Sequence, residues 1–409
     1  MSEWKKVKLG EICSRVTSGG TPKANVESFY TPPTIPWLKT KEVNYSRIYK
    51  TENYISEDGL ANSSAKLIAP NSVIVAMYGQ GDTAGRVAIN KIPLTTNQAC
   101  CNLTFDDTKA NYEFVYYQLC TLYDKMVSLK SGAAQPNLNA QIIKGLEILL
   151  PSLVTQNRIA TILSRYDSLI ENYQKQIKLL EEAAQRLYKE WFVDLHFPGH
   201  ENTKIVDGVP EGWEKKRLGD ITSKFATGLN PRKNFVLGHG NNYYVTIKNM
   251  ANNDVIFDEK CDKVDDEALE KINKRSDLQQ GDLLFSGIGT IGRVYLIDKP
   301  VKNWNISESV FTMRPNPEIP STFLYLGLLD KEIQDYCQSN AHGCAQKGIR
   351  MADLKAFEVL VPSKSISDAF CRVSSNLIKQ IKDKSSQIRL LTEARDRLLP
   401  KLMSGEILV

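Results

Sequence analysis

Three glycines, Gly287, Gly289 and Gly292, have the G-x-G-x-x-G spacing with which many proteins hold the pyrophosphate of a dinucleotide. That chemistry needs the glycines between a strand and the N-terminus of a helix, whose free N–H groups bind the phosphates. Here residues 283–285 and 293–297 flank the glycines with aliphatic and aromatic side chains that favour strands on both sides. The sequence therefore predicts a hairpin and argues against a bound dinucleotide.

The other patterns that could support catalysis are incomplete. Residues 31–34 (Thr-Pro-Pro-Thr) have the prolines of an adenine methyltransferase motif without its amide or acid and its aromatic residue. No G-x-x-x-x-G-K-[ST] stretch for ATP occurs. The acidic residues within 262–267 are more typical of a helix start than of a nuclease metal site, and Cys337, His342 and Cys344 lack a fourth zinc ligand. We expect a non-catalytic chain that binds no metal or cofactor, with a nuclease or methyltransferase in its own right as the alternative.

Composition and charge favour a soluble protein of two or three domains. Of the 409 residues, 42% are hydrophobic and 24% charged, as in ordinary globular proteins. No apolar run reaches the roughly 18 residues of a membrane span, and residues 1–6 do not resemble a signal peptide, so we expect a cytoplasmic protein. The net charge of +5 permits an anionic partner without requiring one.

The two halves of the chain repeat the same landmarks. Residues 4–12 (WKKVKLGEI) match residues 213–221 (WEKKRLGDI), 209 positions later. Gly85-Arg86-Val87, which closes a glycine-rich turn between two apolar runs, matches Gly292-Arg293-Val294. The glycine turn that opened this section is therefore one copy of a duplicated hairpin.

Each half ends in a long helical pattern, in which apolar residues recur every three or four positions. A helix of nearly forty residues extends about 60 Å, and so long an apolar stripe needs a partner of equal length. The two helices are predicted to pack on each other; the alternative is that each packs on its own domain. The residues expected at this packing, or in contact with a partner protein, are Ile159, Ile162, Tyr166, Leu169, Tyr173, Leu180, Leu187, Phe370, Val373, Leu377, Ile381, Ile388, Leu391 and Leu398.

These features predict a mixed α+β fold in which two globular domains, related by an internal repeat, are joined by two long helices. The expected boundaries are domain 1 at 1–151, the first helix at 152–195, a linker at 196–212, domain 2 at 213–362 and the second helix at 363–409.

In this duplicated order the landmarks resemble, over essentially the whole chain, the specificity (S) subunit of type I restriction-modification systems. The resemblance also includes residues 131–137 (SGAAQPN), Gln156-Asn157-Arg158-Ile159 at the start of the first helix, and the closing Leu402 to Ile407. It implies two target-recognition domains that read a bipartite DNA target. It also implies that the two long helices are antiparallel and form a coiled-coil-like spacer, which sets the gap between the two half-sites. It further implies two methyltransferase subunits that use S-adenosylmethionine to methylate adenine, and restriction subunits that use ATP and Mg. A non-catalytic helical scaffold that binds another ligand is the alternative.

Candidate DNA contacts lie on the glycine turns and on the polar loops that precede each helix. Amide side chains suit adenine and basic ones suit guanine, whereas lysines on flexible stems suit phosphates. The turns contribute Tyr78, Gln80, Arg86, Ser286, Thr290 and Arg293; the loops contribute Gln135, Asn137, Asn139, Gln346, Lys347 and Arg350; and Lys39, Lys41 and Lys248 are expected to contact phosphates. The alternative is that these side chains only stabilise hairpins and cap loops.

Overall fold

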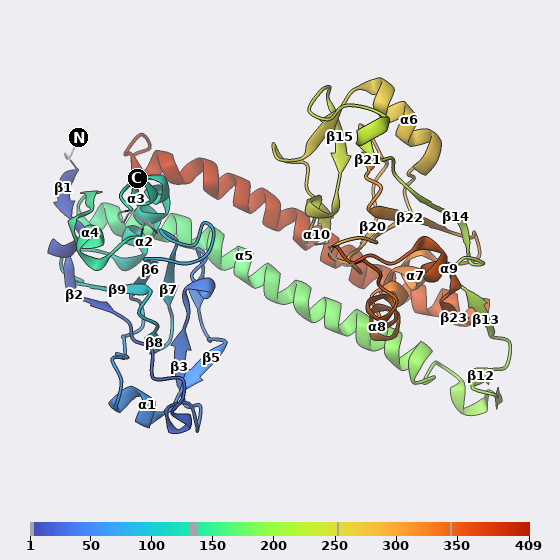
Figure 1. The fold of residues 1–409 in the computed structure, drawn as a ribbon, viewed down its shortest axis with the longest axis horizontal. Coiled ribbons are helices and arrows are strands. Elements are labelled where there is room, and N and C mark those ends of the chain that lie inside the picture. Colours follow the sequence, from blue (N-terminus) through green and yellow to red (C-terminus); the bar gives the residue numbers. More distant parts are fainter. Residues whose placement is uncertain (1–3, 131–136, 252, 344–345) are drawn as a thin grey trace. The chain divides into compact units, whose positions relative to one another are not determined.

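The computed structural model describes residues 4–130, 137–251, 253–343 and 346–409. The chain divides into two compact units: unit 1 comprises Met1–Ile170 and Leu391–Val409, and unit 2 comprises Glu171–Leu390. Each unit therefore contains one head and a segment of both long helices, α5 (Leu153–Tyr188) and α10 (Lys364–Met403), drawn in green and red in Figure 1. Within the described residues, no helix is both long and apolar enough to span a membrane.

The head of unit 1 is built on two sheets. The larger has the order β2-β9-β6-β7-β4, formed by Cys13–Ser18, Cys100–Phe105, Val73–Ala76, Val87–Asn90 and Arg47–Ile48. The smaller has the order β5-β3-β8, formed by Asn53–Ile55, Ile35–Leu38 and Thr95–Thr96. β1 (Lys5–Lys8) pairs with β10 (Glu147–Leu150). The helices are α1 (Glu57–Ala61), α2 (Tyr112–Thr121), α3 (Tyr123–Ser128) and α4 (Ala140–Gly145), with short turns η1 (Leu9–Glu11), η2 (Glu27–Phe29) and η3 (Thr40–Glu42).

The head of unit 2 has the same plan. Its larger sheet has the order β14-β22-β19-β20, formed by Thr222–Thr227, Val310–Pro315, Leu283–Ser286 and Val294–Leu296. Its smaller sheet has the order β18-β15-β21, formed by Asp262–Val264, Asn242–Val245 and Trp304–Ile306, and β13 (Glu214–Arg217) pairs with β23 (Glu358–Val361). The helices are α6 (Asp266–Ser276), α7 (Ser321–Leu328), α8 (Lys331–Ser339) and α9 (Met351–Ala356).

Short elements complete unit 2. The pairs β11 (Ile205–Val206) with β12 (Val209–Pro210) and β16 (Met250–Ala251) with β17 (Asp254–Val255) are antiparallel. The turns are η4 (Lys189–Val193), a π-helical continuation of α5, and η5 (His200–Asn202), η6 (Pro231–Lys233) and η7 (Ile247–Asn249). Asp265, from the acidic run of the sequence, caps α6 by accepting a hydrogen bond of 2.8 Å from the N–H of Ala268, which confirms the predicted helix start.

The internal repeat extends to details of the backbone. In both heads the second strand of the domain carries a bulge at the same place, between Cys13 and Arg15 in β2 and between Thr222 and Lys224 in β14. The glycine turns connect antiparallel strands, β6 with β7 and β19 with β20. The predicted hairpin is thus confirmed, and the strand-to-helix setting of a dinucleotide fingerprint is not formed at these glycines.

The long helices pack antiparallel within each unit. In unit 1, Asp167 of α5 accepts a hydrogen bond of 2.7 Å from Arg395 of α10, while Ile159 and Leu402 share one core. In unit 2 the ammonium of Lys384 lies 5.2 Å from the ring centroid of Tyr173, and the rings of Tyr188 and Phe370 are 6.2 Å apart. In both units, residues later in α5 contact residues earlier in α10. The two helices are therefore antiparallel, as expected.

Two residues of the predicted stripe are not buried between the helices, so their assignment to helix packing is wrong, whereas their contact with a partner protein stays a prediction. Leu169 is 37% exposed and Val373 is 48% exposed, whereas Asp167, Ser374 and Ser385 are buried. Leu169 follows the buried Leu163 by six residues, about 240° around the helix at 3.6 residues per turn, which turns it to the outside. The buried face of each helix includes polar side chains. A prediction that uses apolar residues alone therefore places some residues on the wrong face.

Candidate functional site

In each unit the glycine turn is joined to a loop from later in the chain. In unit 1 the N–H of Leu138 donates to the carbonyl of Met77 at 2.9 Å. In unit 2 the N–H of Ile349 donates to the carbonyl of Gly287 at 2.9 Å, and that of Gly289 donates to the carbonyl of Lys347 at 2.8 Å. We call residues 77–86 with 137–139 turn cluster 1, and residues 286–293 with 346–350 turn cluster 2. The two sets of predicted contacts, distant in sequence, thus meet on one surface in each head.

Arg86 stiffens turn cluster 1. Its guanidinium donates to the side chains of Asp82 at 2.5 Å and Asn44 at 2.9 Å, and the Tyr123 hydroxyl donates to the Asp82 carbonyl at 2.8 Å. The hydrogen bond from Arg86 holds the pKa of the Asp82 carboxyl below its usual value. Gly85 has a φ of 96°, a left-handed conformation that favours glycine. Arg86 therefore has a structural task in the turn, and DNA contact by this side chain stays a prediction.

Turn cluster 2 is fixed by other hydrogen bonds. Ser286 is fully buried; its hydroxyl donates to the Thr290 carbonyl at 2.5 Å and accepts from the Arg293 N–H at 2.7 Å. The Arg293 guanidinium donates to the carbonyls of Ile247 at 3.1 Å and Met250 at 2.9 Å. The expected DNA contact by Ser286 needs correction, because this hydroxyl lies inside the turn and does not reach the surface.

The exposed rim of turn cluster 1 carries polar and basic groups. Tyr78, Gln80 and Asn137 line one open cavity of about 480 Å³ together with Lys130. Partial burial raises the pKa of the Tyr78 hydroxyl, which keeps it a neutral hydrogen-bond donor. Sequence reasoning did not select Lys130, although it directly precedes the polar loop at 131–137. Gln135 lies outside the described residues.

The exposed rim of turn cluster 2 is more basic. Thr290, Gln346, Lys347 and Arg350 are all exposed. A Cβ on Gly289 would lie 3.1 Å from the Gln346 side-chain nitrogen, so the bare glycine leaves room for this amide beside the turn. The two rims therefore present different side chains on the same backbone plan.

The remaining candidates lie elsewhere in the heads. Asn139 caps α4, its side chain accepting from the Ile142 N–H at 2.9 Å, as the capping alternative proposed. Lys39 lies 4.9 Å from the ring centroid of Trp37, beside a cavity of about 600 Å³. Lys41 is paired with Glu52, which raises the pKa of its ammonium, and Lys248 is exposed on η7. The contacts of Lys39, Lys41 and Lys248 with phosphate therefore stay predictions.

The two rims carry side chains that are suited to hydrogen bonding with a polyanion. Among the described residues, no group of three or more His, Cys, Asp or Glu side chains is placed to hold a metal ion. Cys337, from the sequence's candidate cysteine and histidine group, is buried, whereas Cys344 lies outside the described residues. Amide, hydroxyl and basic side chains on rigid turns are the groups that contact bases and phosphates of DNA.

Comparisons with known proteins agree with this geometry. A family model described as the type I restriction modification DNA specificity domain matches residues 1–182 and 210–388. The type I restriction enzyme MjaIX specificity subunit of Methanocaldococcus jannaschii is 29% identical over 419 residues, covering 100% of this chain and 94% of that protein. The HindI specificity subunit of Haemophilus influenzae is 22% identical over 475 residues and is covered completely, as is this chain. In fold, the type I restriction-modification S subunit from M. genitalium is similar with a TM-score of 0.64 and 18% identity, covering 98% of this chain and 96% of that one.

Proposed function

The chain belongs to the type I restriction modification DNA specificity domain family, and from this membership we propose that each of its units reads one half of a bipartite DNA target. It is a specificity subunit, whose task is to recognise DNA. The observation that carries the proposal is the presence of two turn clusters with one backbone plan and different exposed side chains. Because the backbone of the two turn clusters is alike, both can approach DNA in the same orientation. Their different side chains give each cluster its own base preference.

The chemistry of the two rims indicates different base preferences. Turn cluster 1 offers amides at Gln80 and Asn137, and amides pair well with the major-groove edge of adenine. Turn cluster 2 also has an amide, Gln346, but adds Lys347 and Arg350, and basic side chains pair well with guanine. Each well-formed contact of this kind contributes about 1–3 kcal/mol of discrimination. The proposed target is therefore asymmetric, with unlike halves.

The chemical steps belong to partner subunits in this proposal. Two methyltransferase subunits would bind S-adenosylmethionine and methylate adenine, and restriction subunits would use ATP and Mg. Large aliphatic side chains remain exposed on both long helices, with Leu179 of α5 64% exposed and Leu390 of α10 57% exposed. Exposed apolar positions on helices are suited to binding a protein partner, and we assign them to the methyltransferase subunits.

The test is a map of methylated adenine in DNA from cells that express the partner methyltransferase with and without this chain. A two-part motif that appears only with the chain is expected. The variant Asn137→Ala should relax the motif in one half, and Lys347→Ala should relax it in the other, so each variant serves as the control for its counterpart. If an active, chain-bound methyltransferase adds no new methylation, the heads do not read DNA and the scaffold alternative takes precedence.

A further inference from the structure

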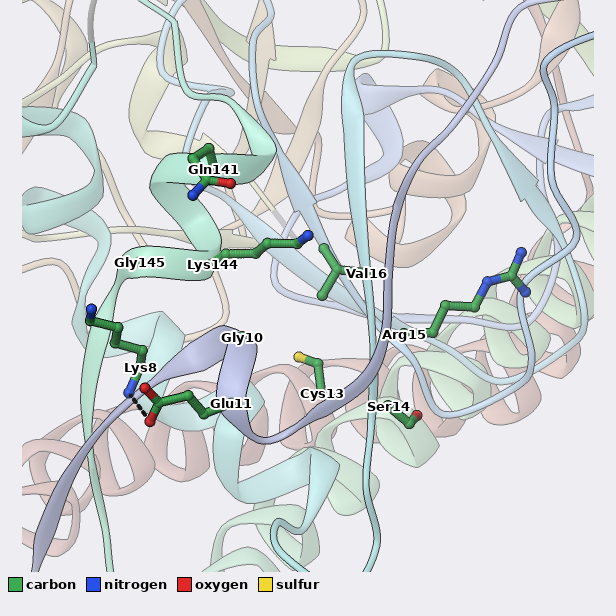
Figure 2. A pocket seen from close by; sticks show the side chains of 10 residues that line it. All are labelled: Lys8, Gly10, Glu11, Cys13, Ser14, Arg15, Val16, Gln141, Lys144 and Gly145. Atoms are coloured by element: carbon green, nitrogen blue, oxygen red, sulfur yellow. Dashed lines mark hydrogen bonds between the residues drawn. The ribbon is translucent and has the colours of Figure 1, made fainter.

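A second polar surface lies in unit 1, outside turn cluster 1. It is an open groove of about 470 Å³ between β1, β2 and α4, and we call it the basic groove. Lys8, Arg15 and Lys144 supply its positive charges, and Ser14 and Gln141 supply neutral polar groups. Figure 2 shows the Lys144 side chain extending from α4 toward β2, while Arg15 stands beyond β2 with its guanidinium directed away from Lys144.

The cations of the groove are available to a ligand. Lys8, Arg15 and Lys144 are exposed, and among the described residues no carboxylate lies within 4.0 Å of their side-chain nitrogens. Glu11 also lines the groove, and its carboxylate accepts from the backbone N–H of Lys8 at 3.2 Å. Burial raises the pKa of the Cys13 thiol to about 12, so this cysteine is no thiolate nucleophile at neutral pH. The groove is therefore suited to binding an anion and not to covalent chemistry.

The position of Lys144 is fixed by a close contact of the backbone. A Cβ on Gly10 would lie 3.3 Å from the Cβ and from the carbonyl oxygen of Lys144, so the bare glycine allows η1 to pack directly on α4. Neighbouring backbone is held by the N–H of Leu9, which donates to the carbonyl of Leu146 at 2.9 Å. This packing constrains the lysine stem, whereas the ammonium at its end is not needed for the packing.

Unit 2 repeats this local backbone structure, with cations at two of the three positions left without a carboxylate partner. A Cβ on Gly219 would lie 3.2 Å from the Cβ of Lys355, and the N–H of Gly219 donates to the Lys355 carbonyl at 3.0 Å. Arg217 occupies the place of Lys8. Lys224 follows the same strand bulge as Arg15, but its ammonium lies 3.6 Å from the Asp277 carboxylate. The two heads have diverged in their rims but have kept two cations beside this glycine contact, Lys8 and Lys144 in unit 1 and Arg217 and Lys355 in unit 2.

Two heads that read different base sequences both meet the same sugar-phosphate backbone. Base edges differ between the half-sites, whereas phosphates do not. We infer that the basic groove is a phosphate-binding site for the DNA strand flanking the half-site, and that Arg217 and Lys355 form its counterpart in unit 2. This inference rests on the proposed function. The groove adjoins turn cluster 1 along the chain, since Asn139 caps the helix that carries Gln141 and Lys144.

A protein partner fits the groove less well than DNA. The fully buried centre of a protein interface is depleted of charged residues, whereas interfaces with DNA are strongly positive. Val16 is the main apolar side chain of the groove lining, which otherwise consists of charged, polar and small residues. The methyltransferase subunit is therefore the alternative occupant, which the experiment distinguishes.

The experiment measures DNA affinity of the full chain bound to its methyltransferase, between about 50 and 200 mM salt, on DNA with and without the mapped target. The slope of log affinity against log salt is negative, and in Lys144→Gln and Lys8→Gln it should become less negative by about 0.9 for each phosphate that the variant no longer neutralises. Between those salt concentrations the wild-type affinity should then drop about 3-fold more than that of either variant. The reduction should be equal on both DNAs and leave the methylated sequence unchanged.

The control is Lys271→Gln, which removes an exposed lysine paired with Glu267 on α6 at 2.7 Å, and should leave the slope unchanged. Lys355→Gln should make the slope less negative, as Lys144→Gln does. Wild-type slopes in Lys8→Gln and Lys144→Gln would overturn the inference. Failure of these variants to assemble with the methyltransferase would assign the groove to that subunit instead. If the proposed function itself is wrong, the wild-type complex methylates no specific sequence. That result differs from failure of the groove inference alone, in which the wild-type complex still methylates its target.

Discussion

At the scale of single residues, one buried carboxylate links the head of unit 1 to both long helices. Asp167 of α5 is 6% exposed and accepts hydrogen bonds from Arg47 at 2.9 Å, from the Tyr117 hydroxyl at 2.5 Å and from Arg395 at 2.7 Å. Arg47 and Tyr117 belong to the head, whereas Arg395 belongs to α10. Removing one member of a buried ion-pair network leaves the other charges uncompensated.

We therefore expect Asp167→Asn to lower the free energy of unfolding of unit 1 by about 3 kcal/mol, the order found when a buried pair loses one partner. Asp396→Asn is the control, because Asp396 pairs with the same Arg395 at 2.8 Å but is largely exposed, and it should cost less than about 1 kcal/mol. Denaturant unfolding of both variants measures the difference. Equal effects of the two substitutions would show that the buried network does not hold the head to the helices.

Lys382 is a buried cation on α10 of unit 2. Its ammonium donates to the Leu296 carbonyl at 3.0 Å, lies 3.6 Å from the ring centroid of Tyr295 and is 3.8 Å from the Asp298 carboxylate. Burial lowers the pKa of this lysine from 10.5 to about 8, although Asp298 and Asp254 oppose the effect. The unfolded chain consequently binds this proton more tightly than the folded chain between pH 8 and 10.5.

The sign of this linkage predicts a pH dependence. Between pH 8 and 10.5 the unfolded state holds more protons at Lys382, so the contribution of Lys382 to stability rises with pH in that window, by up to about 3 kcal/mol. Below pH 8 both states are protonated and the contribution is constant. The difference in unfolding free energy between wild type and Lys382→Met should rise over this window. The exposed Lys379→Met should follow wild type, and a flat difference for Lys382→Met would refute the assignment.

At the scale of elements, patterns with one strong physical cause were predictable. The hairpin at Gly287 to Gly292 followed from strand-forming flanks, and α5 and α10 followed from apolar periodicity; the structure confirms both. The helix stripe failed at Leu169 and Val373 because buried Asp167, Ser374 and Ser385 share the packing face. Those polar residues are buried through partners or small size, which depend on tertiary contacts that periodicity does not encode.

The candidate contacts were predictable as a set of segments but not residue by residue. The turn and the loop meet in each head, yet Ser286 points inward, Asn139 caps α4 and Arg86 braces its own turn. Serine, asparagine and arginine satisfy local backbone and carboxylate groups as readily as they satisfy DNA, so residue type alone did not separate the two roles. Lys130 was not selected because it lies just before the polar loop at 131–137 and outside the segment from which candidates were taken. Its place in the cavity beside Tyr78 is visible only in the fold.

At the scale of the whole molecule, each unit is assembled from segments far apart in the chain. Leu402 and Met403, near the C-terminus, belong to the same core as Phe114 in the head of unit 1. A Cβ on Gly405 would lie 3.4 Å from the indole of Trp4, so both ends of the chain pack in this unit. The stability of the first head therefore depends on residues of α10 that are far from it in the sequence.

This arrangement predicts that Leu402→Ala destabilises the N-terminal head. Leu402 is 1% exposed, and truncating a buried leucine costs about 2–5 kcal/mol, because apolar burial is reduced and a cavity is left behind. Hydrogen exchange should accelerate in amides of residues 4–130, while the head of unit 2 at 213–363 keeps its wild-type rates. Leu408→Ala, at a leucine 72% exposed, is the matched control and should leave both heads unchanged. Faster exchange in unit 2 with unchanged exchange in unit 1 would contradict the assignment of the C-terminal segment to the first head.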